Sequence, residues 1–405
     1  MMINSGDTTW VLISSALVML MTPALGLFYG GMVGKKNVLS TMMMSFVTLS
    51  LISLQWVIYG YSLCFGKDVY GIIGGLNFLG LNGVGQTPNP DYAPTIPHIA
   101  FMLFQMMFAV ITPALITGCY VERVSFGGFL VFMLLWATFV YDPVCHWVWG
   151  VGGWLRKWGV LDFAGGVVVH ISAGISALAA SLVIGKRKGY GKTTYEPSNI
   201  PFTIIGAFLL WFGWFGFNGG SALVSGGLAA SAFLTTNIAG CACGLMWMLL
   251  SWNYKRPSAL GFATGCIVGL ATITPASGYV GALSAIIIGI VSAFLGYYAI
   301  VLRMKTGIDD SLDVFACHGI GGILGVLATG IFANKAINPA GANGLLYGNL
   351  NQFLIQVYAT VIVAIYAFVA TFILTKLVDI VIGFRVSDKE EVVGLDISQH
   401  GETII

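Results

Sequence analysis

The sequence predicts an all-helical integral membrane protein with eleven transmembrane helices, its amino terminus outside the cell and its carboxyl terminus inside. Three observations support this prediction. Hydrophobic residues make up 57% of the 405 residues and charged residues only 8%, whereas soluble domains carry about 25% charged residues. Apolar stretches of about 20 residues, each long enough to cross the hydrocarbon core of a bilayer, recur along the chain. The basic residues also divide unevenly between alternate loops.

The apolar runs between polar breaks define the expected helices. In chain order these spans are 10–32, 39–64, 98–119, 126–145, 164–185, 201–220, 228–252, 258–273, 279–302, 313–333 and 353–384. The eighth span is short and rich in glycine. The 54 glycines of the chain suit a membrane bundle, because small residues let helices approach closely where no hydrophobic effect draws them together.

The distribution of basic residues indicates the orientation. With the amino terminus outside, only Lys67, Arg156, Lys157 and Lys335 lie in outer loops, and the other fourteen basic residues, Lys255 among them, lie inside. Cytoplasmic loops carry an excess of Lys and Arg. An odd number of helices with the amino terminus outside therefore fits the distribution of basic residues best. The net charge of +2 is too small, and the basic residues too scattered, to predict a nucleic-acid partner.

The basic loop within residues 186–200 divides the chain into five spans and then six. We therefore expect two five-helix repeats, 1–185 and 201–334, followed by an eleventh helix at 353–384 and a cytoplasmic tail at 385–405. Because five is odd, the second repeat must run inverted relative to the first, as in many transporters.

Two histidines are the first candidates for a functional site, because ionisable groups inside membrane helices are costly. Of the five histidines, only His170 and His318 lie well inside predicted spans. At 1.5 Å per residue, His170 lies about 9–12 Å below the outer surface and His318 about 8–9 Å above the inner one. The two rings could therefore meet near the midplane. The alternative is that they are two unrelated packing histidines.

Two aspartates stand at the starts of the helices that carry these histidines. Asp162 precedes the fifth span and Asp313 opens the tenth. A carboxylate at this position accepts backbone N–H bonds and faces the positive end of the helix dipole. Simple capping explains both residues. A carboxylate near an entrance would also lower the electrostatic potential for an arriving cation.

Aromatic residues gather near the predicted outer ends of several helices. Phe104 and Phe108 share one helix face, Trp147 and Trp149 fall in an outer loop, and the run 211–221 closes the sixth span. Aromatic faces attract cations by about 0.5–2 kcal/mol. Such stripes more often face lipid or the protein core.

The sequence predicts neither an enzyme nor a cofactor. It contains no Walker loop, no H-E-x-x-H motif and no intramembrane Ser-His-Asp spacing. The seven cysteines are Cys64, Cys119, Cys145, Cys241, Cys243, Cys266 and Cys317. They lie mostly in apolar segments and lack zinc-ligand spacing, so we expect packing roles and no metal. Asp7 precedes the first span and Lys35 follows it, unlike a cleavable signal peptide.

Several segments, in this order, resemble blocks of the ammonium transporter family, which includes the Rhesus proteins. They are Gly26–Gly31, Phe104–Phe108, Asp162–His170, Trp214–Ser221, Thr274–Ala276, Asp313–His318, Gly383–Val386, Gly394–Asp396 and His400–Glu402. The resemblance covers nearly the whole chain and is stronger to the bacterial and archaeal members than to Rhesus proteins. It implies a multi-pass protein of the plasma membrane that assembles as a homotrimer with one pore in each subunit.

The resemblance also implies roles for individual residues. An outer ammonium site would be formed by Trp149, Ser221 and Phe108, and Asp162 would stabilise it from behind. Phe108 and Phe217 would form an aromatic gate, and His170 and His318 would line an apolar pore. Further pore or supporting positions would be Phe104, Gln105, Trp214, Thr274 and Asp313. No residue departs from the family pattern at these positions.

The implied partners are ammonium or ammonia, methylammonium and the lipid bilayer. The tail, residues 385–405, resembles a segment that docks between subunits and responds to a PII-type signalling protein at the cytoplasmic face. A disordered, solvated tail is the alternative.

Energetics favour the passage of neutral ammonia. Moving a bare ammonium-sized ion into low dielectric costs of order 20 kcal/mol. With the Lys pKa of ~10.4 as a proxy, deprotonation at pH 7 costs only about 4–5 kcal/mol. The ammonia could cross with or without a separately moved proton. Two alternatives are a Rhesus-type channel for neutral ammonia or carbon dioxide, and an ammonium sensor, which would usually carry a longer cytoplasmic segment than 385–405.

Overall fold

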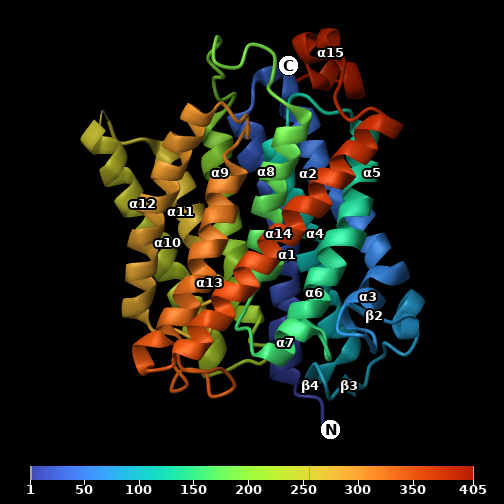
Figure 1. Cartoon of the computed structure of the whole chain (residues 1–405), viewed down its shortest axis with the longest axis vertical. Helices are drawn as coiled ribbons and strands as arrows, with labels where there is room; N and C mark the ends of the chain where they lie inside the picture. The colour runs from blue at the N-terminus through green and yellow to red at the C-terminus, as the bar shows by residue number, and fades with distance from the viewer. Residues whose placement is uncertain (1, 255, 405) are drawn as a thin grey trace.

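The computed structural model describes residues 2–254 and 256–404, so the inner-loop Lys255 lies outside the described residues. Within this part of the chain, ten helices are long and apolar enough to cross a membrane, and an eleventh, Ala259–Ile273, is apolar but shorter. The helices run side by side along the long axis, and the two termini lie at opposite ends (Figure 1). The prediction of an all-helical fold with eleven spans, including the short eighth one, is confirmed.

The first five spans are built from α-helices that are often continued by a π-helical turn. They are α1 (Ser5–Met32), α2 (Val38–Gln55) with η2 (Trp56–Gly60) and α3 (Tyr61–Phe65), α4 (His98–Ile116), α5 (Phe126–Trp136) with η5 (Ala137–Tyr141) and α6 (Asp142–Trp149), and η6 (Gly166–Ile171) with α8 (Ser172–Ile184). The fourth span is longer than expected. Trp147 and Trp149, predicted in a loop, therefore lie in α6, because the helix continues through Asp142 and Pro143 without a break.

The remaining spans are similar in construction. They are α9 (Ile200–Trp214) with η7 (Phe215–Gly219), α10 (Gly227–Tyr254), α11 (Ala259–Ile273), α12 (Ala282–Thr306), η8 (Phe315–Ile320) with α13 (Gly321–Phe332), and α14 (Leu350–Val381). The long helix α14 crosses the bundle obliquely and packs against α8 and α13 (Figure 1).

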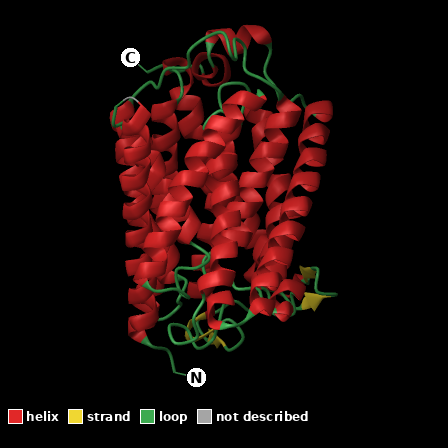
Figure 2. Cartoon of the chain, turned by 60° about the vertical axis from the view of Figure 1, so that its left-hand side comes forward, coloured by secondary structure: helices red, strands yellow, loops and turns green. Residues whose placement is uncertain are grey.

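The loops at the amino-terminal end carry the small amount of β-structure. Strand β1 (Asp68–Val69) pairs with β2 (Ile73–Gly74), and β3 (Pro88–Asn89) pairs with β4 (Ala93–Pro97), both antiparallel. The short helix α7 (Trp154–Trp158) lies at the same end. These strands lie outside the helical bundle (Figure 2), so they cover the outer ends of the helices and leave the core entirely helical.

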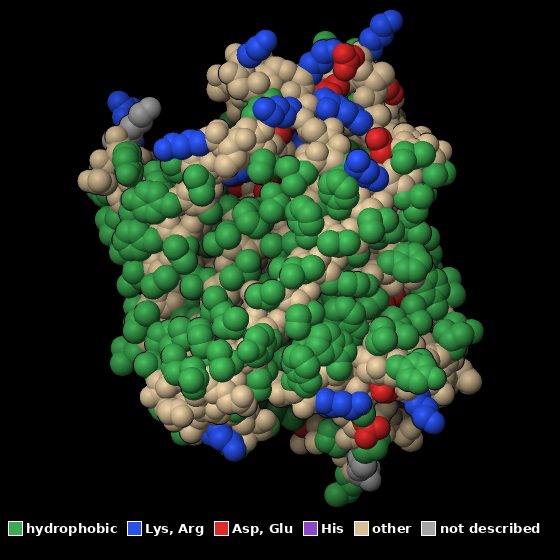
Figure 3. All heavy atoms as spheres, in the orientation of Figure 1, with side chains coloured by type: hydrophobic (Ala, Val, Ile, Leu, Met, Phe, Trp, Pro, Cys, Tyr) green, Lys and Arg blue, Asp and Glu red, His purple; other side chains and the backbone are tan. Residues whose placement is uncertain are grey.

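The surface has the pattern expected of a membrane protein. A broad belt of hydrophobic side chains surrounds the middle of the molecule, and basic side chains gather mainly at the end that carries the carboxyl terminus (Figure 3). Because Lys and Arg are enriched on the cytoplasmic side, this end is the inner one.

Glycines let the two histidine-bearing helices meet at the centre of the bundle. A Cβ atom at Gly174 of α8 would lie 2.0 Å from the backbone nitrogen of Gly319 in η8, and one at Gly322 would lie 2.9 Å from Cβ of His170. Any larger residue at these positions would therefore push the two helices apart. The close approach of η6 and η8 depends on this absence of side chains.

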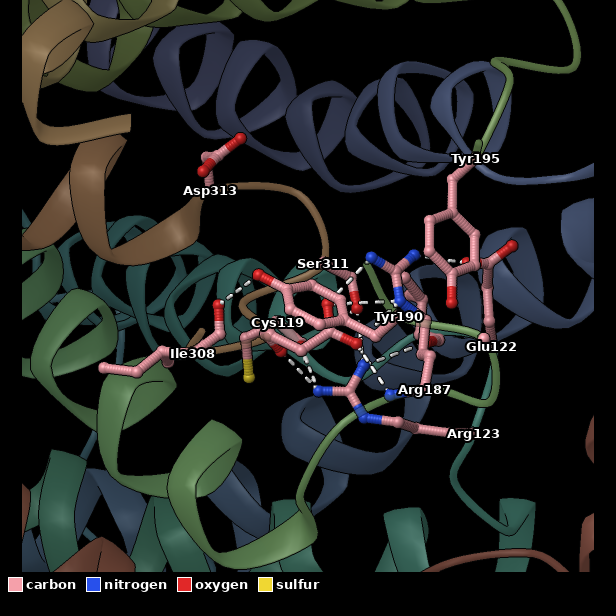
Figure 4. A network of polar contacts seen from close by, with 12 residues as sticks. Cys119, Glu122, Arg123, Arg187, Tyr190, Tyr195, Ile308, Ser311 and Asp313 are labelled. Carbon is pink, nitrogen blue, oxygen red and sulfur yellow. Dashed lines mark hydrogen bonds and ion pairs between the residues drawn. The ribbon is translucent and has the colours of Figure 1, made fainter. Parts of the chain in front are cut away.

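A buried ionic network fixes the cytoplasmic loops (Figure 4). Arg187 donates to Glu122 Oε2 at 2.5 Å and to Asp309 Oδ1 at 2.8 Å. Arg123 donates to the carbonyl of Asp309 at 2.6 Å and to the hydroxyl of Ser311 at 2.5 Å. Burial alone would raise the pKa of Asp309, but its bonds to Arg187 and the charge of Arg123 together lower it. The loop before η8 is therefore held in one place.

The carboxyl-terminal tail is folded against the cytoplasmic loops of its own chain. It forms α15 (Asp388–Val393) and the turn η10 (Asp396–His400). The carboxylate of Asp396 accepts the backbone N–H groups of Leu39 and Ser40 at 3.1 and 2.8 Å, at the start of α2. A tail residue thus caps a transmembrane helix, which is not the arrangement of a disordered, solvated tail.

Candidate pore and cation site

The imidazole rings of His170 and His318 meet at the centre of the molecule. Their Nδ1 atoms lie 3.3 Å apart, and their ring centroids lie 5.2 Å apart with an interplanar angle of 17°. Both residues are buried, and they come from η6 and η8, which enter the bundle from opposite ends. The expectation that oppositely inserted helices bring the two rings together is confirmed.

The short contact between the two Nδ1 atoms restricts the tautomers of the neutral pair. A hydrogen bond needs one Nδ1 that donates and one that accepts. The ring that donates through Nδ1 has a bare Nε2, and the other ring carries its hydrogen on Nε2. The pair therefore offers one acceptor and one donor to a molecule beside it. Among the described residues, the Nε2 atom of His170 has no partner, so it is free to accept a hydrogen bond in one tautomer of the pair and to donate one in the other.

The histidine pair lines a narrow and mostly apolar cavity. The other lining residues are Met21, Leu25, Phe28, Ile111, Leu115, Val169, Leu210, Trp214, Phe217 and Ile267. The indole N–H of Trp214 is already bonded to the hydroxyl of Thr274 at 2.9 Å. The cavity measures about 10 Å³, close to the room that one water-sized molecule needs. It therefore suits a small neutral molecule and has no charged group to compensate an ion.

Two phenylalanine rings are in contact beside this cavity, and one of them lines it. Phe108 of α4 and Phe217 of η7 have ring centroids 4.3 Å apart and are tilted by 33°. Both side chains are buried. Phe104 packs edge-on against Phe108 with centroids 4.9 Å apart. Gln105, the next residue of α4, is half-buried, and its Oε1 has no partner among the described residues. The two rings thus lie between Trp149, which contacts Phe108, and the cavity, which Phe217 lines.

A group of aromatic and polar side chains lies on the outer side of the two rings. Trp149 stands edge-on to Phe108, with centroids 5.8 Å apart and an interplanar angle of 85°. The hydroxyl of Ser221 donates to the carbonyl of Phe217 at 2.8 Å. Its oxygen lone pairs remain available to accept a hydrogen bond. The structure thus brings Trp149 against Phe108, and it places Ser221 one helical turn after Phe217, the ring that contacts Phe108.

Asp162 connects this outer group to the histidine helix. Its Oδ1 accepts the N–H groups of Gly165 and Gly166 at 2.9 and 2.5 Å. Its Oδ2 accepts those of Val167 and Val168 at 2.8 and 3.1 Å. The carboxylate is therefore fully engaged in capping η6. Its backbone carbonyl accepts the indole N–H of Trp149 at 3.0 Å.

The expectation that the Asp313 carboxylate accepts backbone N–H groups is wrong. Asp313 has a left-handed backbone with φ of 59°, and its carboxylate accepts a bond from Nε of Arg303 at 2.5 Å. The backbone N–H of Phe315 at the start of η8 donates instead to Asp310, at 2.7 Å. In Figure 4, Asp313 lies apart from the Arg123 and Arg187 network.

Asp310 is thus the counterpart of Asp162 that the sequence reading missed. A signal for it was present: eight positions separate Asp162 from His170, and eight separate Asp310 from His318. The aspartate chosen from the sequence lies only five positions before its histidine. Equal spacing from the histidine is therefore the better guide to the capping residue.

The chain matches one protein-family model and is similar to known proteins over nearly its whole length. A family model described as "Ammonium Transporter Family" matches residues 9–405. The chain is 49% identical over 399 residues to "Ammonium transporter Amt1" of Archaeoglobus fulgidus, covering 98% of this chain and 99% of that protein. It is also 49% identical over 399 residues to "Ammonium transporter" of Bacillus subtilis, with 98% of each covered.

Two solved structures have the same fold. Candida albicans Mep2 is 36% identical, with a TM-score of 0.90, over 96% of this chain and 88% of that chain. A structure described as "Sensor Amt Protein" is 28% identical, with a TM-score of 0.88, over 98% of each chain.

Proposed function

Because the chain belongs to the ammonium transporter family, we propose that ammonium is captured at the outer aromatic group and that ammonia then passes the histidine pair. The protein is an ammonium transporter of the plasma membrane and not an enzyme. The observation that supports the proposed route most strongly is the contact of 3.3 Å between His170 and His318 in a narrow apolar cavity.

In this proposal the outer site consists of Trp149, Phe108 and Ser221. The rings of Trp149 and Phe108 present π-electrons to a cation, which is worth about 0.5–2 kcal/mol. The hydroxyl oxygen of Ser221 accepts one ammonium N–H. Asp162 acts indirectly, because its carboxylate is engaged by four backbone N–H groups. It holds Trp149 through its carbonyl and adds negative charge behind the site.

The ammonium ion gives its proton to water at the outer site before ammonia enters the cavity. An intact ammonium ion would face a desolvation cost of order 20 kcal/mol in this apolar passage, whereas losing the proton costs about 4–5 kcal/mol at pH 7. The rings of Phe108 and Phe217 form the gate, and they separate slightly to admit ammonia. The walls of the route are supported by four further residues, Phe104, Gln105, Trp214 and Thr274. Asp313 supports the inner end of the route through Arg303.

Within the cavity the histidine pair replaces the hydrogen bonds that ammonia loses on leaving water. The pair offers one acceptor and one donor, and ammonia can satisfy both. Passage of ammonia alone would carry no current. Passage with a separately moved proton would carry one charge for each molecule, and the same pair could relay that proton.

The test is transport by purified protein in liposomes. Inward gradients of ammonium and of methylammonium should each produce uptake that saturates, and current should be recorded on the same preparation across a supported bilayer. Absence of uptake in liposomes that contain correctly folded protein would contradict the proposal. It would then favour a sensor, whereas uptake without current and without competition by methylammonium would favour a Rhesus-type gas channel.

We further propose that the two five-helix segments, 1–185 and 201–334, are inverted repeats, with the eleventh helix at 353–384 and the tail at 385–405 added to them. The equal spacing of Asp162 from His170 and of Asp310 from His318 supports this division. Separate superposition of the two segments after inversion tests it. Lack of a match between η6 and η8 would contradict it.

Assembly and regulation are proposed on the basis of family membership. We propose a homotrimer whose cytoplasmic face, including the tail, binds a trimeric PII-type signalling protein. The folded tail supports this proposal, because it presents a defined surface at the inner end. Light scattering should give a particle of about three chains, and a PII-type protein should bind the wild type more tightly than a protein truncated after Phe384.

A further inference from the structure

Trp149 stands at the carboxyl end of α6, where the backbone N–H of Gly150 closes the last turn on the carbonyls of Cys145 and His146. It is the last residue of α6, and its carbonyl is one of the helix-end carbonyls that have no partner within a helix. The turn that follows, residues 150–153, contains three glycines, and Gly152 has φ of 100°. Because glycine is flexible, contacts outside this turn must help to fix the tryptophan, and the bond from its indole N–H to the carbonyl of Asp162 is one of them.

Arg156 provides a further contact to Trp149 from across the turn. Its Nη1 donates to the carbonyl oxygen of Trp149 at 2.5 Å. Arg156 lies on α7, so the bond closes the glycine-rich turn between α6 and α7. A cation at the carboxyl end of a helix also interacts favourably with the helix dipole.

The guanidinium has a second fixed neighbour. Its carbon lies 5.8 Å from the centre of the Tyr92 ring. That ring stacks on Phe101 of α4, with centroids 5.2 Å apart at 14°. The Tyr92 hydroxyl donates to the carbonyl of Phe65 at 3.0 Å and accepts the N–H of Val151 at 3.0 Å. Tyr92 is therefore held rigidly by several elements.

This chain of contacts joins the two aromatic sides of the outer site. Phe101 lies seven residues before Phe108 on the same face of α4, and Trp149 lies edge-on to Phe108. Arg156 bonds to the helix end that carries Trp149 and lies over Tyr92, which packs on the helix that carries Phe108. The separation of Trp149 from Phe108 is therefore set partly from outside the site.

We propose that Arg156 is a positioning residue for the outer cation site: it holds Trp149 against Phe108 without contacting ammonium itself. This inference rests on the proposed function, because it takes Trp149 as part of that site. A purely electrostatic role has the opposite consequence. A positive charge near a cation site repels the substrate, so its removal would strengthen capture.

The test compares Arg156→Ala, Arg156→Lys and a matched control, Lys157→Ala. Lys157 is the next residue of α7, carries the same charge and is 61% exposed, and its Nζ lies 3.8 Å from Asp68. Uptake of labelled methylammonium into liposomes gives the half-saturating concentration and the maximal rate for each variant. Arg156→Ala should raise the half-saturating concentration about two- to fivefold, the range expected for a charge at a helix end, and leave the maximal rate unchanged. Arg156→Lys should restore part of the loss, and Lys157→Ala should behave as wild type.

Three results for these variants would overturn the inference, and a fourth follows from the comparison with Trp149→Ala. The three are a lower half-saturating concentration in Arg156→Ala, an equal shift in Lys157→Ala, and a fall in maximal rate alone. Trp149→Ala separates this inference from the proposed function. If Trp149→Ala raises the half-saturating concentration but Arg156→Ala does not, only the positioning role fails. If Trp149→Ala behaves as wild type, the outer site itself is wrong.

Discussion

The ring of Phe217 lies nearly parallel to the imidazole of His170, with centroids 6.1 Å apart and an interplanar angle of 24°. The inner ring of the proposed gate thus forms part of the surface that surrounds the histidine pair. Phe108, Phe217, His170 and His318 make one continuous series of ring contacts. A molecule that passes the proposed gate would therefore meet the imidazoles next.

Ser221→Ala should weaken the capture of substrate. The substitution removes the hydroxyl that we propose as an acceptor for an ammonium N–H and leaves the rings in place. The half-saturating methylammonium concentration should rise about two- to tenfold, the value of one hydrogen bond, with little change in maximal rate. Ser225→Ala is the control, because Ser225 bonds to Asp7 instead. Equal half-saturation in wild type and Ser221→Ala would exclude Ser221 from the site.

Asp162→Asn should destabilise the protein more than Asp313→Asn. An asparagine oxygen can accept two of the four N–H groups that the Asp162 carboxylate now accepts. The other two would be left unsatisfied, at about 1–3 kcal/mol each. Asp313 makes one ion pair whose carboxylate is 21% exposed. Thermal unfolding in detergent should give a clearly lower midpoint for Asp162→Asn, and the reverse order would contradict the capping role.

Asp309→Asn should lower stability in a pH-dependent manner. The substitution removes one of the two carboxylates that surround the buried Arg187, and breaking a buried ion pair costs about 3–5 kcal/mol. Burial raises the pKa of Asp309, but its bonds to Arg187 and the nearby charges of Arg123 and Arg187 together bring the pKa below its ordinary value of 3.8 in the folded protein. The contribution of this carboxylate to the free energy of unfolding is therefore fully present at pH values above 3.8, and it is lost as pH falls through the pKa of the folded state.

The difference in unfolding midpoint between wild type and Asp309→Asn should consequently stay constant from about pH 5 to pH 8 and shrink below about pH 4. A difference that grows on acidification would show that the pKa of Asp309 is shifted in the other direction.

Asp396→Ala should release the tail from the cytoplasmic face. The variant loses the carboxylate that caps the first turn of α2. Hydrogen exchange across residues 385–404 should become faster, while exchange in the transmembrane helices should not change. Asp388→Ala is the matched control, because Asp388 is 74% exposed and pairs only with the exposed Lys188 among the described residues. Equal exchange rates in the two variants would mean that Asp396 does not hold the tail.

The membrane topology could be predicted from the sequence, because hydrophobic length and basic loops report directly on the bilayer. The approach of His170 to His318 could also be predicted, since opposite entry of two helices follows from an odd repeat. The choice of Asp313 as a capping residue failed for a conformational reason. Its left-handed backbone directs the carboxylate to Arg303, and no local pattern reveals this.

Other features depend on contacts between segments that are distant in the chain. The bond from Arg156 to Trp149 depends on how α7 folds back after a glycine-rich turn. The use of Asp396 as a cap for α2 joins residues more than 350 positions apart. Hydrophobic periodicity carries no information about such pairs, so only the three-dimensional structure identifies them.

The proposed passage of ammonia past the histidine pair can be tested by ammonium-driven uptake into liposomes. The liposomes contain wild type, His170→Ala, His318→Ala or the control His400→Ala, in which the altered residue lies in the tail. Folding is verified first by an unchanged elution profile. We expect uptake to fall at least about tenfold in each pore variant, because the loss of one hydrogen-bond partner costs the passing ammonia more than about 1 kcal/mol. His400→Ala should keep the wild-type rate. Uptake at the wild-type rate by folded His170→Ala and His318→Ala protein would contradict the proposed route past the histidine pair.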